Sequence, residues 1–197
     1  MDSVFNLDLA LSVALGIGLA AATGFRIFLP MLVTSIAANT GHLPLAEGFA
    51  WLGTPSALIV LGVAATAEIL GYYIPGVDNL LDTLATPAAL VAGTVISAAV
   101  ITDLPPMVKW ATAIIAGGGI AGLMQSTTAL LRAKSTVMTG GIGNPVIATT
   151  ELGSSLIVSL LALAAPFVAL LLVVLFLWLA LRFLLRLTRR DPKPLKE

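Results

Sequence analysis

The sequence contains a stretch, PFVALLLVVLFLWLALRFLL, that runs from Pro166 to Leu185 with a single charged residue, Arg182. A helix of about 20 residues is about 30 Å long, which matches the hydrocarbon thickness of a bilayer. A soluble domain has little use for an apolar run of this length. The stretch therefore predicts a helix that crosses a membrane.

The remaining composition extends this prediction to the whole chain. Charged residues make up 10% of the 197 residues and hydrophobic residues 58%, whereas soluble domains carry about 25% charged residues. The formal net charge is zero, so no basic surface predicts a nucleic-acid partner. Cysteine is absent, which excludes disulfides, thiolate metal sites and a cysteine nucleophile. The lipid bilayer is the expected partner, and no cofactor is predicted.

Glycines, prolines and charged residues divide the apolar sequence into candidate spans. Six are predicted, at about 8–38, 56–74, 87–102, 107–131, 146–164 and 166–187. Only Pro166 separates the last two, so one long bent helix is the alternative there. We expect a single transmembrane domain over residues 1–187, followed by a short charged cytoplasmic tail at 188–197.

Basic residues predict the orientation of these spans. Arg132 and Lys134 fall in the fourth predicted connector, and further basic residues gather at the C-terminal end. Loops rich in lysine and arginine remain in the cytoplasm. With six spans the two regions share one side, so both termini are expected to be cytoplasmic.

A weak internal repeat suggests how the spans are organised. ATAE at 65–68 returns as ATTE at 148–151, and each motif lies in the second of three spans. Because three spans per half is an odd number, the second half would run inverted relative to the first. We therefore predict an all-α membrane fold of two inverted three-helix halves, about 8–103 and 106–187, as in many transporters.

Three ionisable residues lie within the predicted spans: Arg26, Glu68 and Glu151. A charge at the centre of a membrane helix costs about 2.5–3.5 kcal/mol on an insertion scale, so such residues face a partner or a cavity. One hypothesis is that both glutamates carry a proton or cation and Arg26 is their counter-ion. The alternative is that Arg26 pairs with one glutamate only to hold helices together. Pro30 is expected to kink the helix that carries Arg26.

The segment TGGIGNP at 139–145 cannot continue a helix, because its glycines and proline remove helix propensity and a hydrogen bond. We predict a broken or re-entrant helix near 140–150, with the backbone of Gly140, Gly141, Gly143 and Pro145 lining a path. The helix that follows would present free N–H groups to an anionic group. Its candidate binding residues are Asn144, Thr149, Thr150 and Glu151. An ordinary loop with a helix capped at Asn144 is the alternative.

Two further patterns are weaker. Asp78 and Asp82 share one face of a predicted short helix, for which a solvated interfacial helix is favoured over a metal site. Gly118 and Gly122 form a small-residue face that permits close helix contact, and a homo-oligomer is one use for such a face.

Three segments carry a resemblance to a known family: TGFRIFLPML, AEILGYYIPGVDNLLDT and RAKSTVMTGGIGNPVIATTE. They resemble small multi-pass proteins of the bacterial inner membrane that are grouped as a domain of unknown function, number four-one-two-six. The resemblance covers nearly the whole chain and implies location in that membrane, with no established activity. AEILG and TELGS are also similar to the glutamate–glycine motifs of cation-exchanger families, which favours an ion or small solute.

From these patterns we predict a small transporter or channel, coupled to protons through intramembrane carboxylates. A non-catalytic membrane scaffold or assembly factor is the main alternative. An intramembrane enzyme is less favoured, because the predicted spans hold no histidine or cysteine to supply a nucleophile and base.

Overall fold

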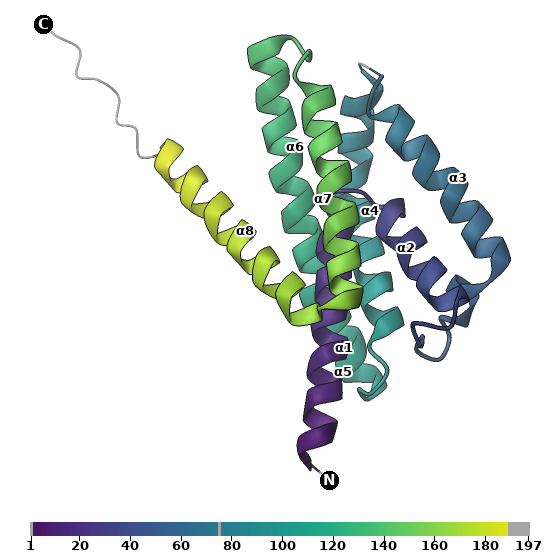
Figure 1. Ribbon diagram of the computed structural model, residues 1–197. Coiled ribbons are helices and arrows are strands. Elements are labelled where there is room, and N and C mark those ends of the chain that lie inside the picture. The colour runs from purple at the N-terminus through teal and green to yellow at the C-terminus, as the bar shows by residue number, and fades with distance from the viewer. Residues whose placement is uncertain (1, 75, 189–197) are drawn as a thin grey trace, which may run out of the picture.

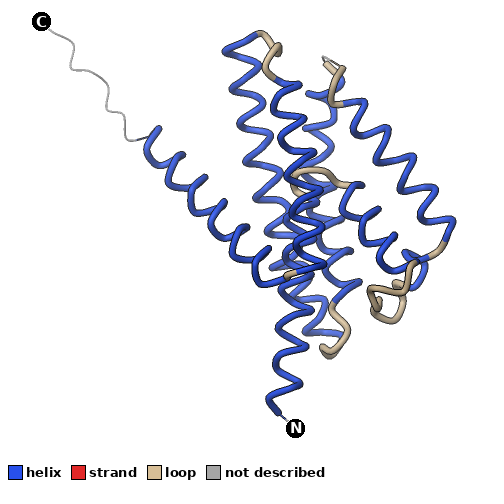
Figure 2. The backbone as a smooth tube through the Cα atoms, viewed as in Figure 1, coloured by secondary structure: helices blue, strands red, loops and turns tan. Residues whose placement is uncertain are grey.

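The computed structural model describes residues 2–74 and 76–188, which fold entirely into helices and their connecting loops (Figures 1 and 2). Of the predicted tail at 188–197, residues 189–197 lie outside the described residues. The helices are α1 (Asp2–Thr23), α2 (Phe28–Asn39), α3 (Pro55–Gly71), α4 (Val77–Val100), α5 (Pro106–Thr112), α6 (Gly119–Thr139), α7 (Asn144–Ala164) and α8 (Pro166–Thr188). A 3₁₀ turn (Ala50–Gly53) precedes α3, and a π-helical segment (Ala113–Gly118) joins α5 to α6.

Three of the described helical segments are long and apolar enough to cross a bilayer: Val77–Val100, Pro106–Thr139 and Asn144–Ala164. Shorter apolar helices complete the bundle, at Leu7–Thr23, Phe28–Asn39, Pro55–Gly71 and Pro166–Leu179. The prediction of an all-helical, multi-pass membrane protein is confirmed at this level.

The first predicted span, 8–38, is not one kinked helix but two helices separated by an unwound segment at 24–27. Here the chain turns back on itself (Figure 1). The turn passes so close to α6 that only glycine fits at position 24: a Cβ on Gly24 would lie 2.4 Å from the Cβ of Met124 and 2.6 Å from the carbonyl oxygen of Ala121. Pro30 falls in the first turn of α2, where a missing N–H costs nothing.

As a result, α1 and α2 run in opposite directions between the same end of the bundle and its middle (Figure 1). Gly16 of α1 lies against Ser97 and Ile101 at the end of α4. After α2, the N–H of Ala46 donates to the carbonyl of Ala99 over 2.7 Å. The start of α1 and the end of α8 therefore lie toward opposite ends of the bundle (Figure 1). The expected arrangement, with one crossing span at 8–38, differs from this one because α1 and α2 form a returning pair.

Small residues allow α4 to pack closely against the π-helical segment and α6. A Cβ on Gly93 would lie 2.4 Å from the Cβ of Ala121, and one on Gly118 would lie 2.5 Å from Oγ1 of Thr94. Gly122 likewise faces Leu90. The glycine face predicted for an oligomer is thus used within the chain, and it gives no support to a homo-oligomer.

Other boundaries also differ from the prediction. α4 begins ten residues before the expected start at 87, so Asp78 and Asp82 belong to the long helix and Pro87 lies inside it. The helix tolerates the proline although the carbonyl four residues earlier loses its N–H donor. Near the C-terminus, Ala165 separates α7 from α8. Helix α8 diverges from α7 and packs on α1, so the last two predicted spans are separate helices (Figure 1).

The segment TGGIGNP forms a turn between α6 and α7 at the end of a helical hairpin (Figure 2). Gly140 and Gly141 have positive φ angles of 63° and 89°, which only glycine adopts readily. The break predicted near 140–150 is therefore present as a turn. The unwound segment inside the bundle is the one at 24–27.

Candidate functional site

Arg132 lies at the centre of a buried group of charged side chains. Its Nη1 donates to Oδ1 of Asp82 over 2.7 Å, and its Nη2 donates to Oε2 of Glu151. These carboxylates come from different helices, α4 and α7. Arg132 is 1% exposed, and its planar guanidinium is suited to hold two carboxylates at once. One arginine of α6 therefore ties three helices together.

Arg26 joins the same group from the unwound segment at 24–27. Its Nη1 lies 3.4 Å from Oε2 of Glu151, and its Nη2 donates to the carbonyl of Ala148 over 2.9 Å. Arg26 lies between α1 and α2 and is not part of a helix, and from this position its side chain reaches α7. The hypothesis that Arg26 neighbours Glu151 thus agrees with the geometry, but Glu151 is shared with Arg132.

The ring of Tyr72, at the end of α3, lies against both guanidinium groups. The centroid of its ring is 3.8 Å from Cζ of Arg26 and 4.3 Å from Cζ of Arg132. Such contacts stabilise cations that have lost their water. We refer to Arg26, Tyr72, Asp82, Arg132 and Glu151 as the charge cluster.

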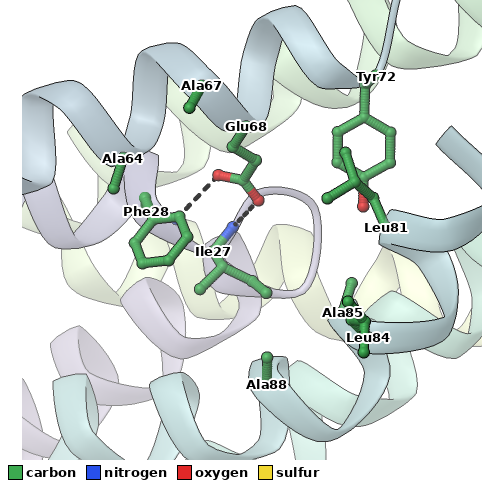
Figure 3. Close-up of a pocket in the computed structure, with 10 residues that line it drawn as sticks. All are labelled: Ile27, Phe28, Ala64, Ala67, Glu68, Tyr72, Leu81, Leu84, Ala85 and Ala88. Atoms are coloured by element: carbon green, nitrogen blue, oxygen red, sulfur yellow. Dashed lines mark hydrogen bonds between the residues drawn. The ribbon is translucent and has the colours of Figure 1, made fainter. Parts of the chain in front are cut away.

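Glu68 lies outside the charge cluster, where it caps a helix. Its two carboxylate oxygens accept the backbone N–H groups of Ile27 over 2.7 Å and Phe28 over 3.0 Å (Figure 3). These N–H groups are at the start of α2, where no preceding turn supplies acceptors. A carboxylate also interacts favourably with the positive end of the helix. Glu68 therefore holds the unwound segment in place.

Glu68 also faces an apolar pocket of about 320 Å³ between α3 and α4 (Figure 3). Leu81, Leu84 and Ala88 of α4 line the side opposite Phe28. These α4 side chains offer a carboxylate no hydrogen-bond donor, so the backbone of α2 supplies its partners.

Glu68→Gln should lower the free energy of unfolding by about 1–3 kcal/mol, the cost of leaving one buried donor unsatisfied. Glutamine has one acceptor oxygen, so either the N–H of Ile27 or that of Phe28 loses its partner. The measurement is equilibrium unfolding in mixed micelles, with the exposed Glu47→Gln as the matched control. Equal stability of the two variants would contradict the capping role.

A hydrogen bond between Asp78 and Asn144 joins the α3–α4 turn to the α6–α7 turn at one end of the bundle. Nδ2 of Asn144 donates to Oδ2 of Asp78 over 2.7 Å and to Oγ1 of Thr136 over 2.9 Å. Asp78 and Asn144 are each 3% exposed. The prediction that Asp78 lies on a solvated face is wrong, because α6 and α7 cover it.

The other predicted site residues lie around these groups. Gly140, Gly141 and Pro145 line a pocket of about 90 Å³ beside Asp78 and Asn144. Gly143 instead packs against Ser135 and Thr139. Thr149 exchanges a hydrogen bond with the hydroxyl of Tyr73 over 2.9 Å. Thr150 is exposed on α7 and bonds only its own helix, through the carbonyl of Val146.

Asp82 is the cluster residue that a solute could approach from outside. Its side chain is 13% exposed and lies in a groove of about 580 Å³ between α4 and α6. Thr83, Thr86 and Ser126 supply hydroxyl groups along this groove. Among the described residues, no group of three or more His, Cys, Asp or Glu side chains could hold a metal ion. The charge cluster is held together by ion pairs between Arg26, Arg132, Asp82 and Glu151.

Arg132 is a site residue that was not predicted, because its charge and that of Lys134 favour a cytoplasmic connector at this point of the sequence. A signal was present: Gln125, Thr128 and Arg132 recur every three to four residues, and all three are buried on one face of α6. Polar residues with helical spacing inside a span indicate a face turned toward protein. Tyr72 carried no comparable signal.

Comparison with known proteins identifies a family and adds no activity. No curated protein and no solved structure matches the chain. A family model matches residues 13–186, which include α2 to α7 and every member of the charge cluster. The chain therefore belongs to the family described as Domain of unknown function (DUF4126).

Proposed function

We propose that this protein is a small secondary transporter for an ion or small solute, coupled to protons through the charge cluster. The observation that carries the proposal is the shared guanidinium of Arg132, buried between Asp82 and Glu151. An ionisable group within a membrane helix is costly and indicates function by default. Here four such groups meet at one place.

Charge balance suggests how the cluster responds to a proton. Arg26 and Arg132 carry two positive charges, and Asp82 and Glu151 carry two negative charges, so the ionised cluster is neutral. Oε2 of Glu151 faces both arginines, whereas its Oε1 is buried with no hydrogen-bond partner among the described residues. A proton on Oε1 would weaken both contacts of Oε2. Arg132 would then have Asp82 as its one ionised partner, and its tie between α6 and α7 would loosen.

The groove between α4 and α6 supports a route for that proton. Asp82 is the partly exposed member of the cluster and contacts Arg132 directly. In this proposal, Asp82 exchanges protons with the groove and Glu151 is the inner carboxylate. Glu68, which the sequence analysis paired with Glu151 as a carrier, serves instead as the cap of α2.

The direction of the helices gives limited support to inverted halves. α3 runs opposite to α7, and α4 runs opposite to α8 (Figure 1). The helices that precede these pairs do not correspond to one another. Helices α1 and α2 run in opposite directions, whereas α5 and α6 form one continuous rod. We therefore infer an inverted relation only for the α3–α4 and α7–α8 pairs.

We place the protein in the bacterial inner membrane with the α6–α7 turn in the cytoplasm. The basic residues of the sequence gather in the segment before this turn and at the C-terminal end of the chain. The start of α1 would then be outside. The natural chain has no cysteine, so single cysteines report cleanly. On intact cells, an impermeant thiol reagent should label Asp103→Cys but not Met138→Cys. The reverse labelling pattern would contradict this orientation.

A membrane scaffold is the second candidate. The observation that favours it is Glu68, whose two oxygens are both used by the backbone of α2. If the charge cluster had the same role, its ion pairs would only fix helix packing. Purified protein in liposomes distinguishes the two candidates. Under an imposed pH gradient, the transporter should carry protons faster than empty liposomes when its solute is supplied from a panel of ions and metabolites. Folded protein that shows no flux with any member of the panel would favour the scaffold.

A further inference from the structure

A second polar site lies at the end of the bundle, where the α3–α4 turn meets the α6–α7 turn. Its pocket of about 90 Å³ is lined by Asp78 and Asn79 on one side and by Thr136, Gly141 and Asn144 on the other. It is separate from the groove that reaches Asp82, which lies between α4 and α6. The charge cluster makes no use of Asp78 or Asn144.

The hydrogen bonds of Asp78 leave its charge without a cationic partner. Oδ1 accepts the backbone N–H groups of Gly76 over 2.9 Å and Asn79 over 2.8 Å, and Oδ2 accepts only Nδ2 of Asn144. The ion pairs of the described residues involve Asp82 and Glu151 but not Asp78. A carboxylate that is 3% exposed thus depends on neutral donors alone.

Asn144, which lines the same pocket, has an amide oxygen that is unsatisfied. Its Nδ2 makes two hydrogen bonds, but its Oδ1 is buried without a partner among the described residues. Buried polar atoms are seldom left unpaired in native proteins. Because Nδ2 is fixed by Asp78 and Thr136, the amide cannot rotate to satisfy Oδ1 without losing both bonds. Oδ1 therefore requires a ligand that is a donor or a cation.

We propose that this pocket binds a monovalent metal cation, with Oδ2 of Asp78 and Oδ1 of Asn144 as ligands. One positive charge neutralises the single carboxylate. Calcium takes six to eight oxygen ligands and its sites contain several carboxylates, which this pocket lacks. An anion would be repelled by Asp78. The site requires no transport activity and stands apart from the proton-coupled role of the charge cluster.

Sodium is the probe for this site. The full-length protein is melted in sodium chloride and in choline chloride of equal ionic strength, and the binding of radiolabelled sodium is measured in parallel. For the wild type, saturating sodium should raise the Tm by about 4 °C or more relative to choline. Asp78→Asn should lose this shift and the bound sodium. Asp103→Asn, which removes an exposed carboxylate at the other end of the bundle, should retain both.

Asn144→Ala tests the second ligand and serves if Asp78→Asn does not fold. It retains both backbone donors to Asp78 but removes Oδ1, so it should weaken sodium binding by about tenfold or more. Equal sodium shifts in the wild type, Asn144→Ala and Asp103→Asn would overturn the proposal, since the effect would then not arise from this pocket. Absence of any sodium effect on the wild type would also overturn it. Stabilisation by magnesium or calcium alone would overturn the monovalent assignment.

Discussion

Arg132→Met should lower the free energy of unfolding by about 3–5 kcal/mol, the usual cost of removing one partner from a buried ion pair. Methionine fills a similar volume, so the loss would come from charge and not from a cavity. Asp82 and Glu151 would be left facing each other across the site, with Arg26 as the one remaining cation. The loss is measured by equilibrium unfolding in mixed micelles.

The matched control is Arg182→Met, which removes an exposed arginine of α8 that stacks on Trp178. A surface substitution of this kind should change stability by about 0.5 kcal/mol or less. The double variant Arg132→Met, Glu151→Gln should lose less stability than the sum of the losses in the two single variants. The difference, which is the coupling free energy, should be about 0.5–3 kcal/mol. Strict additivity, or a stable Arg132→Met protein, would show that the ion pairs contribute little.

Several features of the fold could be predicted from the sequence because they depend on local chemistry. Low charge and long apolar runs indicate membrane helices, and the glycines at 140–143 indicate a helix break. Intramembrane charge at Arg26, Glu68 and Glu151 indicated buried polar sites, and all three side chains are buried. Each of these inferences needs only the residue and its close neighbours in sequence.

The missed features depend on contacts between distant segments. Hydropathy ended the fourth span at residue 131, because Arg132 and Lys134 are charged, whereas α6 continues to Thr139. The partners that accommodate Arg132 are Asp82 and Glu151, which lie 50 and 19 residues away. Periodicity correctly placed Asp78 and Asp82 on one helix face. It could not show that this face is covered by α6 and α7.

The turn at 24–27 was also beyond local reasoning. An apolar run with one arginine and one proline predicts a kinked crossing helix, and nothing in residues 8–38 states that α6 passes close to Gly24. Glu68 was predicted to carry a proton because it is acidic and buried. Its partners, the N–H groups of Ile27 and Phe28, exist only because the helix is interrupted.

Glu151→Gln should abolish proton-coupled flux. Glutamine retains the shape of the side chain and an acceptor for Arg132, but it cannot gain or lose a proton. Some stability should also be lost, because Glu151 is the counter-ion of both Arg26 and Arg132. Stability alone therefore cannot separate the transport role from a packing role, and flux must be measured on the folded protein.

The decisive measurement is proton uptake by liposomes that contain equal amounts of folded wild type, Glu151→Gln or Asp103→Asn, with the same pH gradient and the same supplied solute. Asp103 is an exposed carboxylate outside the charge cluster, so its variant controls for the chemical change. We expect wild-type flux for Asp103→Asn and the rate of empty liposomes for Glu151→Gln. Wild-type flux through folded Glu151→Gln would contradict the claim that this carboxyl group carries the proton.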